Sequence, residues 1–103
     1  MVYVVVTMTI KDGCMEESLE LCGRLRPLVL AERGCIGYDY VRENASLLSI
    51  QEAVDRNRIT LIERWESPEA LAAHGASPHM KALGPKMAEL RSGVTARAGE
   101  AIF

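Results

Sequence analysis

His74 and His79 are the only histidines of the chain, and they stand five residues apart across a stretch that contains glycine, serine and proline. An imidazole titrates near neutral pH, so either side chain could accept a proton from a ligand hydroxyl or hydrogen-bond to it. The alternative for His79 is that it braces the break between two helices. A metal site built from His74, His79 and Glu63 is not favoured, because the spacing is irregular.

Glu63 and Trp65 alternate onto the same face of a strand that the pattern predicts over residues 59–66. A carboxylate on an otherwise apolar face must be paired, hydrogen-bonded or raised in pKa. A salt bridge across a dimer is the favoured interpretation of Glu63, and proton abstraction is the alternative. Trp65 could stack on an aromatic substrate or fill the core.

Hydroxyl groups are a third set of candidates. Tyr38 and Tyr40 share one face of a predicted strand, and Tyr3 and Thr7 share one face of another. Hydroxyls at the edge of an apolar pocket can orient a small ligand, so Tyr38, Tyr40 and Thr7 are candidate substrate-binding residues. Anchoring the core of the sheet is the alternative role for the tyrosines.

The elements that must position these residues follow from hydrophobic periodicity, turn signals and helix caps. Their order is β-α-β-β-α-β, with the second helical segment broken into two helices at Gly75. It predicts one α+β domain over residues 1–103 with a ferredoxin-like split βαβ topology, an antiparallel sheet and helices on one face. The other sheet face must then meet a partner, and a second copy would satisfy this. Residues 42–58 are expected to extend a strand hairpin or to form a short lid helix. The predicted strands cover residues 2–10, 35–41, 59–66 and 94–103, and the helices end near residues 33, 74 and 90.

Composition excludes several classes of protein. The net charge is −2 and basic residues are scattered among acids, so a nucleic-acid partner is not expected. The apolar N-terminal run is too short to span a membrane and carries no signal-peptide features. The three cysteines have no metal-site or disulfide spacing, which predicts reduced thiols in the cytoplasm.

Four segments resemble the antibiotic biosynthesis monooxygenase family. They are LRPLV at residues 25–29, RGCIGY at 33–38, LIERWESPEAL at 61–71 and HGASPH at 74–79. The resemblance covers nearly the whole chain except the stretch around 42–58, which is longer here.

The resemblance implies a dimeric α+β barrel with a cavity in each protomer. Members of the family oxidise phenolic, quinol or anthrone-like aromatics with molecular oxygen and use no flavin, haem or metal. The expected partners are therefore a second copy, a small aromatic substrate and molecular oxygen, with no cofactor. The chain contains no glycine-rich nucleotide-binding motif and no metal-spaced Cys/His cluster, in agreement with this expectation.

The haem-degrading branch of the family is disfavoured by comparison of its site residues. Its asparagine, tryptophan and histidine correspond here to Thr7, His74 and Gly84. None of the three matches.

The aromatic-polyketide branch matches in part. Its strand tryptophan is kept as Trp65, but its asparagine and tyrosine correspond to Leu61 and Leu71, which removes the specific hydrogen bonds of that branch. We therefore expect a quinol-monooxygenase-like enzyme acting on a small quinol or phenol. A non-redox isomerase acting on a small hydroxyketone and a non-catalytic dimeric binding module are the alternatives, because fold similarity alone does not fix activity.

Overall fold

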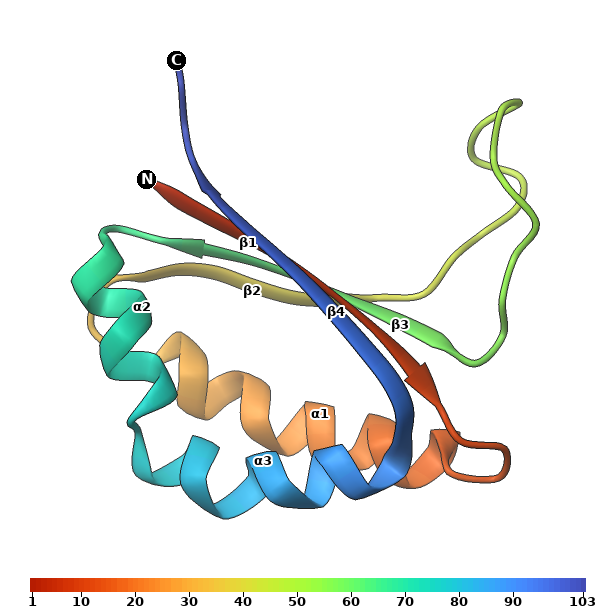
Figure 1. The fold of residues 1–103 in the computed structure, drawn as a ribbon, viewed down its shortest axis with the longest axis horizontal. Coiled ribbons are helices and arrows are strands. Elements are labelled where there is room, and N and C mark those ends of the chain that lie inside the picture. Colours follow the sequence, from red (N-terminus) through yellow and green to blue (C-terminus); the bar gives the residue numbers. More distant parts are fainter.

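The computed structural model describes residues 1–103 and contains the seven expected elements in the expected order (Figure 1). They are β1 (Val2–Ile10), α1 (Met15–Leu30), β2 (Cys35–Val41), β3 (Arg58–Trp65), α2 (Pro68–Gly75), α3 (Pro78–Leu90) and β4 (Arg91–Glu100). Three boundaries differ from the prediction by three residues. The first helix ends at Leu30 rather than near Arg33, and the last strand covers Arg91–Glu100 rather than residues 94–103.

The four strands form one sheet in the order β2-β3-β1-β4, and every neighbouring pair is antiparallel. All three helices lie on the same side of this sheet, and the other side is bare (Figure 1). The predicted α+β class, with ferredoxin-like topology and an antiparallel sheet, is therefore confirmed.

The core between sheet and helices consists of two clusters. The aliphatic cluster lies toward the junction of α3 and β4, and the aromatic cluster lies toward the end of β3. The aliphatic cluster contains Met8, Ile10, Leu21, Cys22, Leu25, Ile59, Leu83, Met87 and Leu90. The aromatic cluster contains Val2, Val4, Val29, Tyr38, Leu61 and Trp65. Val6, Tyr40 and Met80 are partly buried and pack against both clusters, so the two meet at these side chains.

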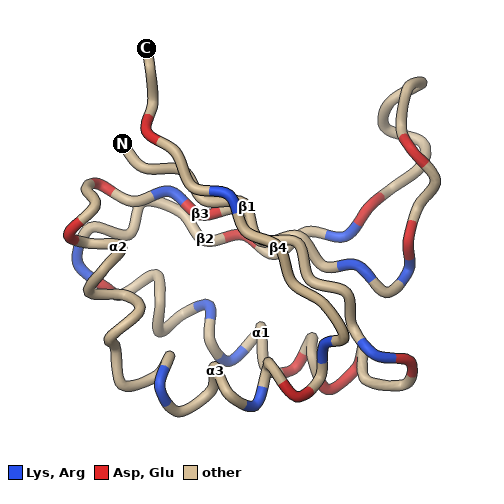
Figure 2. The backbone as a smooth tube through the Cα atoms, in the orientation of Figure 1, with Lys and Arg blue, Asp and Glu red and all other residues tan.

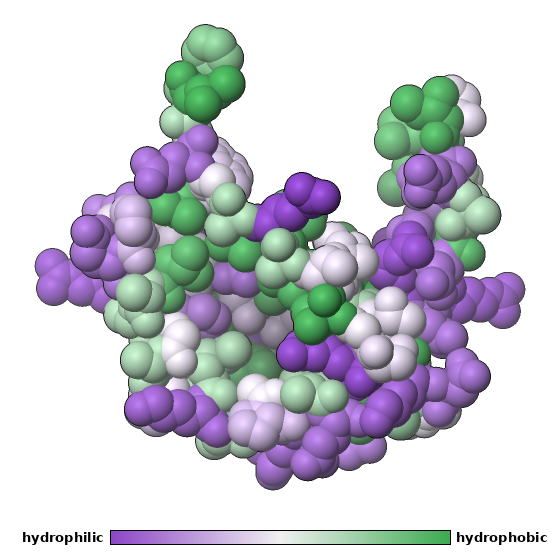
Figure 3. All heavy atoms as spheres, viewed as in Figure 1, coloured by the Kyte–Doolittle hydropathy of each residue, from purple (hydrophilic) through white to green (hydrophobic).

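The segment between β2 and β3 projects from the body of the protein (Figure 1). Residues 42–57 contain turns and bends but neither a strand nor a helix, so the expected hairpin extension or lid helix is absent. Leu47, Leu48 and Ile50 are exposed at the tip. Figure 3 shows this tip and the C-terminal end as two separate apolar projections.

Charged residues of both signs are interspersed along the helices and the loop, without a one-signed face in this view (Figure 2). No helix is both long enough and apolar enough to cross a bilayer.

Candidate functional site

A cavity of about 400 Å³ lies between the sheet and the helices, where the two core clusters meet. Figure 3 shows the molecule hollowed between these two layers. Most of its lining is hydrophobic, and Met8, Leu25 and Met87 line the part that belongs to the aliphatic cluster. The polar lining comes from Tyr38, Tyr40, Glu63, His74 and Arg91. A mostly apolar cavity with a few convergent polar groups is typical of a small-molecule site.

His74 is the buried imidazole of this cavity, and its Nδ1 lies 2.8 Å from Oε2 of Glu32. Because a carboxylate can only accept, the hydrogen bond places the proton on Nδ1 and leaves the lone pair on Nε2. No group of the protein hydrogen-bonds to Nε2 of His74, and this nitrogen retains some accessible surface. Because His74 lines the cavity, Nε2 opens to it. This arrangement is that of a general base oriented by a carboxylate.

The same oxygen of Glu32 also bonds His79, at 2.8 Å from Nε2. His79 does not line the cavity. It lies behind Glu32 and is less buried than His74, with 18% of its side chain exposed compared with 7%. Glu32 thus joins the two histidines that the sequence separates by a helix break.

The backbone around Glu32 depends on Gly34. Gly34 has a φ of 85°, and a Cβ atom there would lie 2.6 Å from the Cβ of Ala70 on α2. Glycine is therefore required both for the left-handed turn and for the close approach of α2. Its carbonyl accepts the backbone N–H of Glu66 at 2.8 Å, which fastens the turn to the start of α2.

Serine caps position the two histidines. Ser67 caps α2 by accepting from the N–H of Ala70. Ser77 is buried at the start of α3, and its hydroxyl donates to the carbonyl of His74 at 2.7 Å. The end of α2 is therefore tied to the start of α3, which holds His74 and His79 on either side of Glu32.

Two aromatic rings enclose the imidazole of His74. The Trp65 ring is fully buried, with its centroid 4.7 Å from that of His74 and tilted by 35°. Tyr38 meets His74 edge-on at 5.5 Å. Trp65 does not line the cavity, so the structure places it behind His74, where it fixes the plane of the imidazole.

Glu63 lines the cavity beside this group and is 4% exposed. Its Oε1 accepts the indole N–H of Trp65 at 2.8 Å. Burial raises the pKa of Glu63, and the indole hydrogen bond and the neighbouring His74 only partly offset this effect. Within this chain Glu63 makes no ion pair, and its partner is the indole N–H of Trp65. The salt bridge across a dimer stays a prediction.

Tyr38 and Tyr40 both line the cavity, and their rings meet edge-on with centroids 5.4 Å apart. Burial raises the pKa of both phenols, so both stay protonated at neutral pH and can donate a hydrogen bond. Thr7 does not join them. It faces the bare side of the sheet, because the residues of β1 that face the helices are Val2, Val4, Val6, Met8 and Ile10. Its assignment to the site is corrected accordingly.

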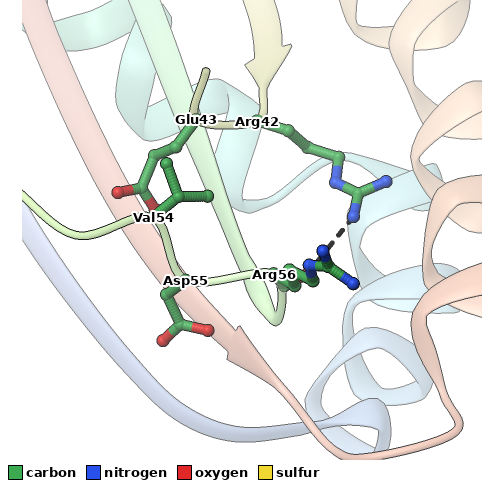
Figure 4. Close-up of a pocket in the computed structure, with 5 residues that line it drawn as sticks. All are labelled: Arg42, Glu43, Val54, Asp55 and Arg56. Atoms are coloured by element: carbon green, nitrogen blue, oxygen red, sulfur yellow. Dashed lines mark hydrogen bonds between the residues drawn. The ribbon is translucent and has the colours of Figure 1, made fainter. Parts of the chain in front are cut away.

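A second pocket of about 500 Å³ lies at the base of the 42–57 loop and provides a contrast (Figure 4). Arg42 donates to the backbone carbonyl of Arg56 at 3.3 Å, and Glu43 and Asp55 are both paired with Arg58. Because both acids of the pocket are already paired and only one lining residue is hydrophobic, this pocket offers a ligand little apolar surface.

Glu32, His74 and His79 offer three metal-ligand atoms within 4.8 Å of one another. Tetrahedral zinc, bound at about 2.0–2.1 Å, holds its nitrogen and oxygen ligands about 3.3 Å apart. Both nitrogen–oxygen distances here are 2.8 Å. The three residues therefore have the geometry of a hydrogen-bonded cluster, which a metal ion would have to open. Glu63, considered from the sequence as a third ligand, is not part of it.

The fold and the site together define a small ferredoxin-like α+β protein with an imidazole–carboxylate pair at an apolar cavity. The model of the antibiotic biosynthesis monooxygenase family matches residues 1–85, and the chain belongs to this family.

Named relatives are similar over part or all of the chain. An Escherichia coli K12 protein named "Probable quinol monooxygenase YgiN" is 41% identical over 64 residues, which cover 62% of this chain and 61% of that protein. Rv0793 of Mycobacterium tuberculosis superposes with a TM-score of 0.84 at 22% identity, covering 99% of this chain and 95% of the other. A Nitrosomonas europaea protein gives 0.85 at 16% identity, with both chains fully covered. These two likenesses concern the fold alone.

Proposed function

We propose that this protein is a cofactor-independent monooxygenase that oxidises a small quinol or phenol with molecular oxygen. The observation that carries the proposal is the unpaired Nε2 of His74, which opens to an apolar cavity while Nδ1 is held by Glu32. Membership of the family and the printed name of the Escherichia coli relative support the same reaction. The three free thiols suit a reducing compartment, so we place the protein in the cytoplasm.

The residues of the chain account for the first step. Nε2 of His74 accepts the proton of a substrate hydroxyl, and Glu32 stabilises the imidazolium that results. The lining of the cavity is mostly hydrophobic and solvates an anion poorly, so the electron-rich anion can pass an electron to oxygen. One oxygen atom then enters the ring and the other leaves as water, while the quinol becomes a hydroxyquinone. Tyr38 and Tyr40, which stay protonated, donate to the substrate oxygens.

We also propose that the bare sheet face pairs with a second copy, which would complete a dimeric α+β barrel of residues 1–103. Tyr3, Val5 and Ile62 lie on this face and are 43%, 42% and 40% exposed. Threonines and arginines alternate with them, so the face is mixed rather than purely apolar. Light scattering coupled to size-exclusion chromatography tests this proposal, and Val5→Lys should convert a dimer into a monomer.

A second candidate function has its own support. Glu63 has a raised pKa and lines the same cavity as His74, so an acid and a base are available together. An enolising isomerase acting on a hydroxyketone needs such a pair.

The deciding experiment measures oxygen uptake with benzene and naphthalene quinols, using heat-inactivated protein to subtract autoxidation. With ¹⁸O₂, one labelled atom should enter the product, and His74→Gln should abolish the enzymatic rate while its unfolding midpoint stays close to that of the wild type. Conversion of a hydroxyketone under nitrogen, without uptake of oxygen by any quinol, would favour the isomerase instead.

A further inference from the structure

The cavity contains one basic side chain besides His74, the guanidinium of Arg91. Arg91 stands at the junction of α3 and β4 and is partly buried. It makes none of the ion pairs of the chain, and its side-chain contact is a weak one, from Nη1 to Sδ of Met8 at 3.8 Å. A guanidinium over a thioether, with no acid within salt-bridge distance, retains its capacity to pair with an anion.

Strand register places Arg91 at the opposite end of the cavity from Glu63 and the neighbouring His74. On β1, Ile10 is paired with Arg91, whereas Val4 is paired with Glu63. The six residues that separate Ile10 from Val4 correspond to about 20 Å of strand. The side chains of Arg91 and Glu63 both reach into the space between these points.

From this placement we infer that Arg91 is an anion-binding residue and that the ligand of this cavity is an aromatic acid. Its hydroxyl lies at His74, its ring system lies among the methionine and leucine side chains, and its carboxylate or sulfonate is paired with Arg91. The orientation of the hydroxyl rests on the proposed function. The anion site rests on Arg91 alone.

The inference has a physical basis in charge and shape. The His74 end already holds the acidic residues Glu32 and Glu63, whereas no acid lies within salt-bridge distance of Arg91, so the charge of an acidic ligand is placed at the Arg91 end. A guanidinium can hold a carboxylate through two parallel hydrogen bonds, which fixes the long axis of the ring system. The volume of about 400 Å³ is within the usual range for small-molecule sites.

The test is calorimetric binding of three redox-inert naphthalenes to the intact protein. They are 6-hydroxy-2-naphthoate, its methyl ester and 2-naphthol. The acid should bind the wild type at least about 10-fold more tightly than the ester or the naphthol, and added salt should reduce this preference. Arg91→Gln should abolish the preference, and Arg91→Lys should restore part of it. Arg97→Gln, which removes an exposed guanidinium from the same strand, should leave it unchanged.

Equal binding of acid and ester by the wild type would overturn the inference, as would absence of binding by all three compounds. Retention of the preference in Arg91→Gln would also overturn it. These ligands need no turnover, so failure of the oxygen-uptake experiment with an intact preference for the acid would count against the proposed function alone. If replacing the 6-hydroxyl by a methoxyl weakens binding to the wild type but not to His74→Gln, the assigned orientation is supported. An equal loss of affinity in the wild type and in His74→Gln would refute the assigned orientation.

Discussion

The two clusters of the core share one sheet and one helix layer, yet they differ in what they leave unsatisfied. The aliphatic cluster holds only hydrocarbon and sulfur side chains, so it needs no hydrogen-bond partner, although Met8, Leu25 and Met87 also line the cavity. In or beside the aromatic cluster lie an imidazole with a free nitrogen, a buried carboxylate, the buried phenol of Tyr38 and the half-buried phenol of Tyr40. Buried polar groups reduce stability unless they are fully paired. The comparison indicates that the aliphatic cluster stabilises the fold and the surroundings of the aromatic cluster carry the chemistry.

Truncation in the aliphatic cluster should give the largest change in stability. Ile59 is fully buried there and does not line the cavity. We expect Ile59→Ala to lower the free energy of unfolding by roughly 2–4 kcal/mol, because methyl groups are lost and a void remains. Urea denaturation measures this change, and Ile102→Ala, in the exposed tail, is the matched control. Loss of quinol turnover in Ile59→Ala, measured where it is still folded, would show that the two clusters are not separable.

A change at Glu32 should reduce turnover and leave stability nearly unchanged, the reverse of the change at Ile59. Glu32→Gln keeps the size of the side chain but removes the charge that holds the Nδ1 proton of His74, so we expect turnover to fall about 10- to 100-fold. The free energy of unfolding should change by less than about 1 kcal/mol, because Glu32 and His74 lie at the edge of the core. Turnover and thermal unfolding are measured on the same samples, with Glu20→Gln on the exposed face of α1 as control. Unchanged turnover would remove Glu32 from the site.

Glu63 offers a test that depends on pH. Burial raises the pKa of Glu63 in the folded state, so folding favours its protonated form. The contribution of this residue to stability is therefore lost as pH rises from its ordinary pKa through the raised one. Glu63→Gln removes the titration, and we expect the variant to be more stable than the wild type by about 1 kcal/mol at pH 8, with no such gain near pH 4. Urea unfolding at both pH values tests this, and a gain that is the same at both would contradict the burial of a charged carboxylate.

The sequence predicted the order of the elements and the common face of Glu63 and Trp65, because periodicity is a local property. It could not predict Glu32, whose partners lie 42 and 47 residues away and meet it only through the turn at Gly34. The face of Thr7 was also undetermined, since both faces of β1 begin with apolar residues. Register was needed to place Arg91 at the far end of the cavity.

The loop of residues 42–57 should give the smallest effect of all. Ile50 is 88% exposed at its tip, and Leu48 is 61% exposed. Both side chains stay largely in water when the monomer folds. Leu48→Ser and Ile50→Ser should therefore each change the free energy of unfolding of the monomer by no more than about 0.5 kcal/mol. Thermal unfolding and quinol turnover should match the wild type within this limit. A marked loss of turnover with unchanged unfolding would mean that these apolar side chains reach a cavity during the reaction. The loop would then belong, with the surroundings of the aromatic cluster, to the part of the molecule that carries the chemistry.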